Sequence, residues 1–164
     1  METEASEGNI VERVIPTENV QLMFHYRNPF VVVEGEIIAK YQPRTIISGL
    51  SNSYSDVSTF GQAGVAFVQF QPAGACHFFK FPLSEIENQS FDLSDIFNAE
   101  IKQIEEKLFE SKTIQERVFL IESFLMSKFS PIPQYDQLFL DKGIQVIKQS
   151  RGQISANSLA EKLT

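Results

Sequence analysis

The sequence predicts an α+β protein in which a β-rich amino-terminal part is followed by a layer of helices. Up to Gln69, short segments of alternating polar and apolar residues are separated by turn residues, as expected for antiparallel strands. From about Asp92 onward, apolar residues recur at the spacing of amphipathic helices. A phenylalanine-rich stretch, 64–97, joins the two parts. We expect both parts to pack on its rings, which are Phe67, Phe70, Phe78, Phe79, Phe81, Phe91 and Phe97.

Six segments have the pattern of strands. The segment 20–26 has one apolar face, formed by Val20, Leu22, Phe24 and Tyr26. The segment 65–70 is apolar on both faces, which predicts a strand that is covered on both sides. The remaining strands are predicted at 10–15, 30–33, 36–41 and 45–50, whereas 51–58 is predicted to be a polar loop. This periodicity is compatible with a small barrel and with an open sheet packed on helices.

Two helices are predicted between Asp92 and Phe129. Asp92 or Ser94 can cap the first, whose apolar stripe consists of Phe97, Ile101, Ile104 and Leu108. Thr113 and Glu116 form a capping box for the second, whose stripe consists of Ile114, Val118, Ile121 and Leu125. Further apolar residues widen this second stripe, so the helix either lies centrally in the core or presents a spare face to another subunit. The residues predicted for a dimer contact are Phe119, Leu120, Phe124 and Met126.

Two prolines mark the clearest boundary in the chain. Pro131 and Pro133 stop the second helix and predict a stiff linker at 131–135, between a domain at 1–130 and a segment at 136–164. A helix is predicted over 136–150, with Gly152 in the left-handed position after it. Another helix is predicted to follow from Ile154.

Composition limits the classes of function. The 164-residue chain has a formal net charge of −7 and a pI of about 4.9, which disfavour nucleic-acid binding by the chain as a whole. Its one cysteine, Cys76, excludes an internal disulfide, and a cytoplasmic location is expected. No apolar run reaches the roughly 18 residues that a membrane span needs.

The chain shows no motif of catalysis, and we expect neither an enzyme nor a cofactor. His25 and His77 stand apart from each other and lack metal-ligand spacing, so they are predicted to be structural and no metal site is expected. A small-molecule pocket in the β-rich part is the alternative to a fully packed interior. Its predicted polar groups are His25 and Gln69, and its predicted rings are Phe24, Tyr26, Tyr41, Phe67 and Phe70.

The order of these motifs resembles the amino-terminal domain of AraC-type transcriptional regulators. The central part of the resemblance consists of the strand 65–70, Pro72-Ala73-Gly74-Ala75, Phe78-Phe79, 82–86 and 92–97. It extends upstream to Ile15-Pro16, 22–24 and 47–49, and downstream to 115–117 and 121–125. It therefore covers most of the chain.

The resemblance implies a cupin-like β-barrel that senses a small-molecule effector, helices through which two subunits pair, and a helix-turn-helix domain that binds DNA. Gly152-Gln153-Ile154 and Leu159-Ala160 resemble the opening of that last domain, so 136–164 is expected to hold its first helices. We expect the recognition helix to lie beyond Thr164, so that this fragment has no DNA-binding residues of its own.

Three functions are compatible with these observations. The first is the effector-sensing and dimerisation region of an AraC-family regulator. The second is a stand-alone, cupin-like protein that binds a small molecule or acts as an enzyme. The third is an interaction module whose β-rich part is fully packed. A homodimer and a small-molecule effector are the partners expected for the first function, and no membrane is expected to take part.

Overall fold

The computed structural model describes residues 2–3, 11–35 and 37–163, and in these residues the chain is an α+β protein built on two antiparallel sheets. The larger sheet has the strand order β1-β8-β3-β6-β9. Its strands are β1 (Glu2–Thr3), β3 (Gln21–His25), β6 (Thr45–Ser48), β8 (Ala63–Gln69) and β9 (Ser90–Asp92). The smaller sheet has the order β2-β7-β4-β5. Its strands are β2 (Val11–Val14), β4 (Val31–Glu34), β5 (Ile37–Tyr41) and β7 (Ser55–Ser58).

The six predicted strands are present, with ends that differ by a few residues. Ile10 and Glu36, the predicted first residues of two of them, lie outside the described residues. The prediction of a loop over 51–58 is wrong in its second half, because β7 pairs with both β2 and β4. Val57 and Ser58 of β7 are both buried, and Val57 packs against Phe30 and Val65, although the surrounding serines made the segment look polar. β9 is likewise a strand that the pattern did not predict.

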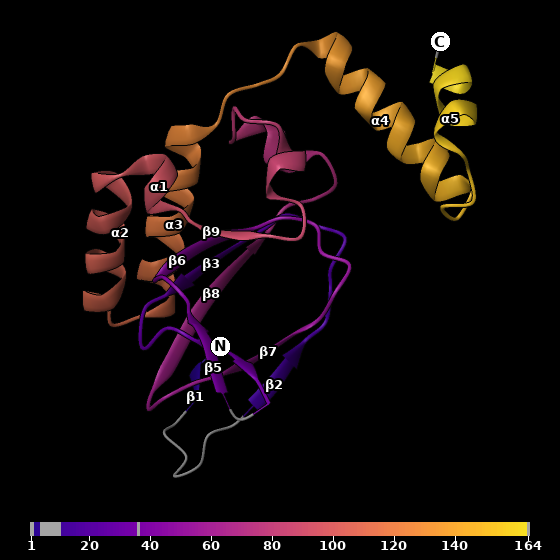
Figure 1. Cartoon of the computed structure of the whole chain (residues 1–164). Coiled ribbons are helices and arrows are strands. Elements are labelled where there is room, and N and C mark those ends of the chain that lie inside the picture. The colour runs from indigo at the N-terminus through magenta and orange to yellow at the C-terminus, as the bar shows by residue number, and fades with distance from the viewer. Residues whose placement is uncertain (1, 4–10, 36, 164) are drawn as a thin grey trace.

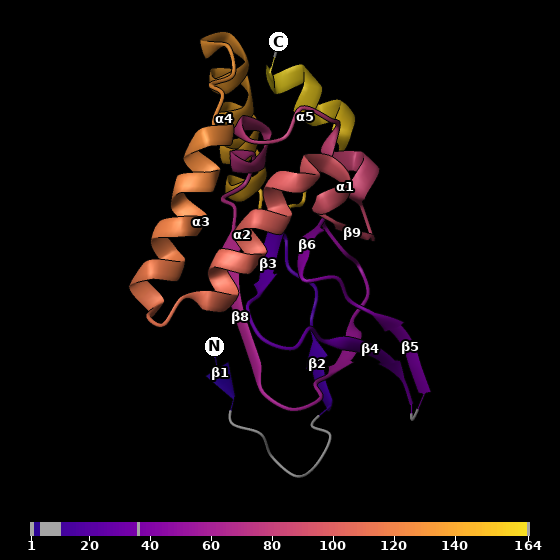
Figure 2. The same cartoon turned by 90° about the vertical axis from the view of Figure 1, so that its left-hand side faces the viewer.

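Helices cover one face of the larger sheet (Figures 1 and 2). They are α1 (Ser94–Phe97), α2 (Ala99–Glu110) and α3 (Ile114–Lys128). Leu22 and Phe24 of β3 point into the core beneath them, where they join the predicted stripe residues Ile101, Ile104 and Leu108 of α2. The helical conformation is interrupted between α1 and α2 at Asn98, whose φ is 46°. Two 3₁₀ turns, η1 (Gly74–His77) and η2 (Leu83–Ile86), carry the chain from β8 to this layer.

The capping box at the start of α3 is confirmed. The Glu116 N–H donates to Thr113 Oγ1 over 3.2 Å, and the Thr113 N–H donates to Glu116 Oε2 over 3.2 Å. Only part of the apolar stripe of α3 is buried, because Ile114 and Val118 are exposed. The helix is rotated so that Arg117 and Phe124 face the core together with Ile121 of the stripe. Arg117 occupies the space that an apolar residue was expected to fill.

The prediction that the strand at 65–70 is covered on both sides is also wrong in part. Val65 is buried with Phe30 and Val57, which belong to the region of the smaller sheet. Phe67, two residues further along the same face, is 51% exposed. The smaller sheet therefore covers one end of β8 and leaves the other end open.

The two carboxy-terminal helices stand away from the sheets, at the end of the segment that contains Pro131 and Pro133 (Figure 1). α4 (Gln134–Gln149) and α5 (Ala156–Leu163) pack on each other, with Leu163 of α5 near Gly143 of α4. α4 begins two residues earlier than predicted, directly after Pro133. Gly152 has a φ of 75°, which is the left-handed conformation expected after that helix.

Candidate functional site

A pocket of about 200 Å³ opens where the smaller sheet stops covering the larger one. Eighteen residues line it, and they come from both sheets and from the loops between them. β3 contributes Gln21 and Met23, β8 contributes Phe67, and β7 contributes Ser55 and Val57. The partly open end of β8 is therefore one wall of a cavity.

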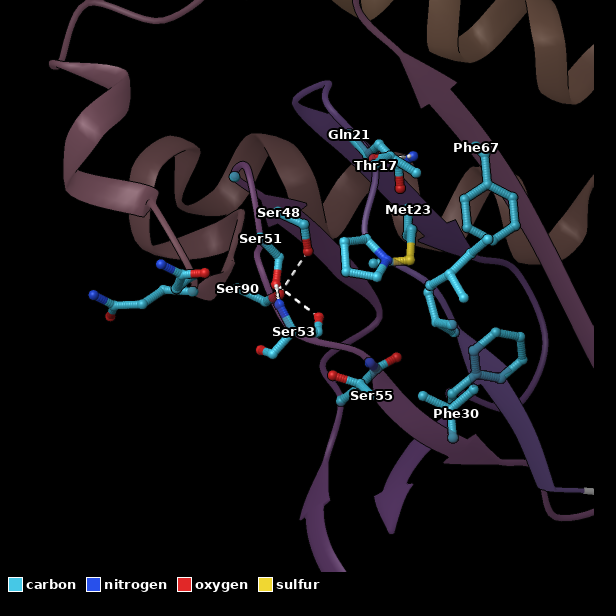
Figure 3. Close-up of a pocket in the computed structure, with 18 residues that line it drawn as sticks. Thr17, Gln21, Met23, Phe30, Ser48, Ser51, Ser53, Ser55, Phe67 and Ser90 are labelled. Carbon is cyan, nitrogen blue, oxygen red and sulfur yellow. Dashed lines mark hydrogen bonds between the residues drawn. The ribbon is translucent and has the colours of Figure 1, made fainter. Parts of the chain in front are cut away.

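One side of the pocket is apolar. Met23 and Phe67 are neighbours across β3 and β8, where they are paired in register. Val57 of β7 and Phe30, which directly precedes β4, extend this surface. In Figure 3 the side chains of Met23, Phe30 and Phe67 lie together on one side of the cavity. This side offers a hydrophobic surface to a bound molecule.

The opposite side of the pocket consists of serine hydroxyl groups (Figure 3). The Ser48 and Ser90 hydroxyls are 2.5 Å apart, across the pairing of β6 with β9. Ser51 donates through Oγ to the carbonyl of Ser53 over 2.9 Å, which holds the loop before β7 in place. Ser55 follows at the start of β7. Each hydroxyl can both donate and accept a hydrogen bond.

Gln42 places an unpaired acceptor in the pocket lining. Its side-chain oxygen Oε1 is buried and has no hydrogen-bond partner in the part of the chain that the structure describes. A buried acceptor without a partner costs roughly 1–3 kcal/mol of stability, so such groups are uncommon. Because Oε1 is closed off from solvent, a molecule in the pocket reaches it only if neighbouring atoms move.

The rim of the pocket is held by a close approach between backbone segments. Gly49 lies against Ile86, and a β-carbon at position 49 would come within 2.6 Å of the Ile86 carbonyl carbon. Asn88, whose φ is 55°, accepts from the Asn52 N–H over 2.9 Å and donates its own N–H to the Leu50 carbonyl over 2.7 Å. These contacts fix the loop after β6 against the turn that leads to β9.

None of the eighteen described lining residues carries a charged side chain. Asp56 lies between two lining residues of β7, and strand alternation turns it to the other face. There it forms a two-pronged ion pair with Arg13, over 2.8 Å and 2.9 Å. The hydrogen bond from Arg13 lowers the pKa of the Asp56 carboxyl below its usual range. Charge is therefore close to the pocket but is neutralised outside it.

The five predicted pocket rings do not share one cavity. Phe67 lines the pocket, whereas Phe24, Tyr26 and Phe70 are buried in the core beneath the helices. Tyr41 is 71% exposed on β5, an edge strand. Of the two predicted polar groups, Gln69 is exposed and His25 is buried edge-on against Phe30, with ring centroids 4.8 Å apart. The pocket residues that sequence reasoning missed are mainly the serines of 48–55 and Gln42.

His25 lies outside the pocket and packs against Phe30, which lines it. Its Nδ1 lies 3.1 Å from the Arg44 carbonyl oxygen, and burial lowers the pKa of the imidazole. The other histidine, His77, lies far from it in sequence and stacks on Phe129, with ring centroids 5.4 Å apart. His77 Nε2 also lies 3.0 Å from Gln137 Oε1, which connects η1 to α4.

Other candidate chemistry is sparse. Burial raises the pKa of the Cys76 thiol, which donates to the Ala73 carbonyl. Among the described residues, no group of three or more His, Cys, Asp and Glu side chains could hold a metal ion. Within the same residues, none of the helices has the length and apolar character needed to cross a membrane.

The predicted dimer residues divide between the two faces of α3. Phe119 and Met126 are each 69% exposed. Phe124 is buried against the ring of Phe97, with centroids 5.5 Å apart, and Leu120 is partly buried against the core. The exposed side of α3 also carries Ile114 and Val118. Four large apolar side chains are therefore in contact with solvent on one helix.

Comparison with known proteins gives one match. A family model described as a domain of unknown function, DUF6597, matches residues 1–92, which is more than half of the chain. The matched region ends with β9 and includes all the pocket residues, which lie between Val14 and Ser90. No curated protein and no solved structure matches the chain.

Proposed function

The chain belongs to the DUF6597 domain family, and from that starting point we propose that it is the effector-sensing and dimerisation region of an AraC-type transcriptional regulator. In this proposal the two sheets form a cupin-like sensor, the pocket receives a small-molecule effector, and α3 pairs two subunits. The sequence resemblance to AraC-type regulators supports the assignment, together with the position of β3, the exposed side of α3 and the placement of α4 and α5.

The position of β3 is the observation that carries the proposal. One face of this strand contributes Met23 to the pocket, and the other contributes Leu22 and Phe24 to the core under the helices. Alternation of side chains places these residues next to one another on opposite faces of one sheet. A ligand that shifts Met23 therefore acts directly on the surface that supports α2 and α3. This is a short physical route from the pocket to the helices.

The exposed side of α3 supports pairing of two subunits. Ile114, Val118, Phe119 and Met126 lie within an arc of about 140° when the helix is drawn at 100° per residue. Exposed helix faces are normally polar, and clustered apolar residues commonly mark interaction sites. A second copy of the chain is the partner that the proposal assigns to this face.

The arrangement of α4 and α5 supports the regulator class. These helices form a pair that stands apart from the sheets, as a separate module would (Figure 1). His77 and Gln137 connect the sensor part to α4 directly. In the proposal, α4 and α5 begin the helix-turn-helix domain and DNA is contacted by residues beyond them.

A second candidate is a stand-alone protein that binds a small molecule. All the pocket residues lie within the matched region 1–92, so a complete pocket does not depend on α4 and α5. The two candidates differ in the residues expected beyond Thr164 in the source protein. Sequencing the reading frame past that position is therefore the test. The regulator predicts a continuation with the pattern Ser-x-Arg-x-Leu-x-Arg-x-Phe and basic helices, whereas a stop codon directly after Thr164 contradicts it.

A further inference from the structure

The chemistry of the pocket defines a class of ligand. We infer that the pocket binds a small uncharged molecule with several hydroxyl groups and one apolar face, such as a monosaccharide or a cyclitol. This inference rests on the proposed sensing function, because it names the ligand of the same pocket. It depends on the charge, the hydrogen-bonding groups, the apolar side and the size of the pocket.

Charge excludes ionic ligands. Since no described lining residue is charged, a carboxylate, phosphate or ammonium group would leave water without gaining an opposite charge. Arg13 and Asp56 are already paired with each other on the far face of β7. A neutral molecule avoids this desolvation penalty, so the pocket discriminates against charged relatives of its ligand.

The hydrogen-bonding groups favour hydroxyls on the ligand. Ser53, Ser55 and Gln89 line the pocket, and their side-chain hydroxyl and amide groups can donate and accept hydrogen bonds. Gln42 Oε1 can only accept, and it lacks a partner among the described residues. A ligand O–H group satisfies both kinds of protein group, because it is itself a donor and an acceptor.

The remaining side of the pocket and its volume set the shape of the ligand. Met23, Phe30 and Phe67 present an apolar surface opposite the serines, which suits the C–H face of a saturated ring (Figure 3). The volume of about 200 Å³ lies below the roughly 300–1,000 Å³ of pockets that hold drug-sized molecules. One ring therefore fits the pocket, whereas a chain of several sugar units exceeds it.

A titration of the whole 164-residue chain, followed by amide NMR signals, tests the inference with matched probes. Glucose, glucuronate and glucosamine share a pyranose ring and differ in charge. Myo-inositol and cyclohexanol share a six-membered ring and differ in the number of hydroxyls. Glucose and myo-inositol are expected to shift the signals of Ser53 and Ser55 in a saturable manner, with the signal of Ser84, which lies on η2 outside the pocket, unchanged.

Two variants locate the binding. Ser55→Ala and Gln42→Leu are each expected to weaken binding of the neutral probes by about tenfold, which is about 1.4 kcal/mol. Gln42→Leu is also expected to unfold at a higher urea concentration than the original chain, because it removes a buried acceptor that has no partner among the described residues. A variant that folds better and binds worse separates loss of binding from loss of structure. Ser84→Ala is the control and is expected to change neither measurement.

The possible results separate the ligand class from the sensing function. Binding of glucuronate or glucosamine at the same signals, as tightly as glucose, overturns the uncharged class but leaves the pocket as a sensor site. Tighter binding of cyclohexanol than of myo-inositol overturns the requirement for hydroxyls and also leaves the site intact. Failure of both neutral probes to shift any pocket signal at millimolar concentration overturns the inference. The regulator assignment is decided separately by the sequence beyond Thr164.

Discussion

The guanidinium carbon of Arg117 lies 4.1 Å from the centroid of the Tyr26 ring, and this contact joins α3 to the segment that directly follows β3. Both residues are buried. Arg117 Nη2 also donates to the Ser111 carbonyl over 2.7 Å, at the end of α2. One cation therefore contacts the sheet, α2 and α3 at the same time. This contact explains why α3 turns its arginine inward and leaves two apolar residues of the predicted stripe outside.

Replacing Arg117 tests this role in stability. Arg117→Ala is expected to lower the free energy of unfolding by about 2–3 kcal/mol, since it removes a desolvated cation–π contact and a charged hydrogen bond. Urea unfolding followed by circular dichroism measures the change. Lys102→Ala, on the exposed side of α2, is the control and is expected to change stability by less than about 0.5 kcal/mol. Equal losses of unfolding free energy in Arg117→Ala and Lys102→Ala would show that the contact of Arg117 with Tyr26 does not stabilise the fold.

Replacing Gly49 at the rim of the pocket is expected to lower the stability of the fold. In Gly49→Ala the new methyl group would overlap with the carbonyl of Ile86, so the strand end and η2 must move apart. Such overpacking typically costs about 1–3 kcal/mol. Thermal unfolding measures the loss, and the amide signals of Asn88 and Gln89 are expected to move because they lie on the displaced rim.

Gly143, in contrast to Gly49, is a glycine whose replacement by alanine is expected to stabilise the chain. It lies inside α4, and a β-carbon there would make an ordinary contact of 3.7 Å with Leu163. Gly143→Ala is expected to stabilise the chain by roughly 0.4–1 kcal/mol, because alanine loses less conformational freedom in a helix. If Gly49→Ala also stabilised the chain, the close approach to Ile86 would not hold in solution.

The parts of the fold that the sequence predicted are those determined by local interactions. The capping box of Thr113 and Glu116 depends on residues three apart, and the buried stripe of α2 depends on helical periodicity. β7 and β9 are short and serine-containing, so their strand character comes from pairing with distant strands. The rotation of α3 depends on Arg117 meeting Tyr26, a contact between residues far apart in the chain.

The pocket was less predictable for a related reason. The prediction relied on aromatic residues, and the structure places three of the five in the core because they alternate toward the helices. The serines at positions 51, 53 and 55 have the character of loop residues in the sequence, and their convergence with Ser48 depends on Gly49 approaching Ile86. The repeated serines were the available signal, but their sequence alone does not show which partner segment faces them.

Stability is expected to fall in mild acid because of His25. Burial lowers the pKa of His25, so the unfolded chain binds a proton more readily than the folded chain at pH values below the ordinary histidine pKa of about 6.5. His25 Nε2 is buried and has no partner among the described residues, so a proton there would lack an acceptor. The free energy of unfolding is therefore expected to decrease as the pH falls from 7 toward 5.

His25→Asn isolates this effect, because its amide can still donate to the Arg44 carbonyl but does not titrate. Glu105 has the opposite influence, since burial raises the pKa of its carboxyl and favours the folded state in acid. The informative quantity is therefore the difference in the free energy of unfolding between the original chain and His25→Asn. The contribution of Glu105 is the same in both proteins and cancels in this difference. This difference is expected to change with pH between 7 and 5, and a constant difference would contradict a buried, neutral His25.

Self-association through α3 is tested by placing a charge on its exposed side. Phe119→Glu and Met126→Glu are each expected to weaken the proposed dimer by about a hundredfold or more, because the charge would be buried without a partner in both subunits. Analytical ultracentrifugation over a range of concentrations measures the dissociation constant. Tyr135→Glu, at a position of α4 that is 76% exposed, is the matched control and is expected to leave the dimer intact.

A chain that stays monomeric at high micromolar concentration contradicts pairing through α3. A dimer that is disrupted by Tyr135→Glu and not by Phe119→Glu would move the interface to α4.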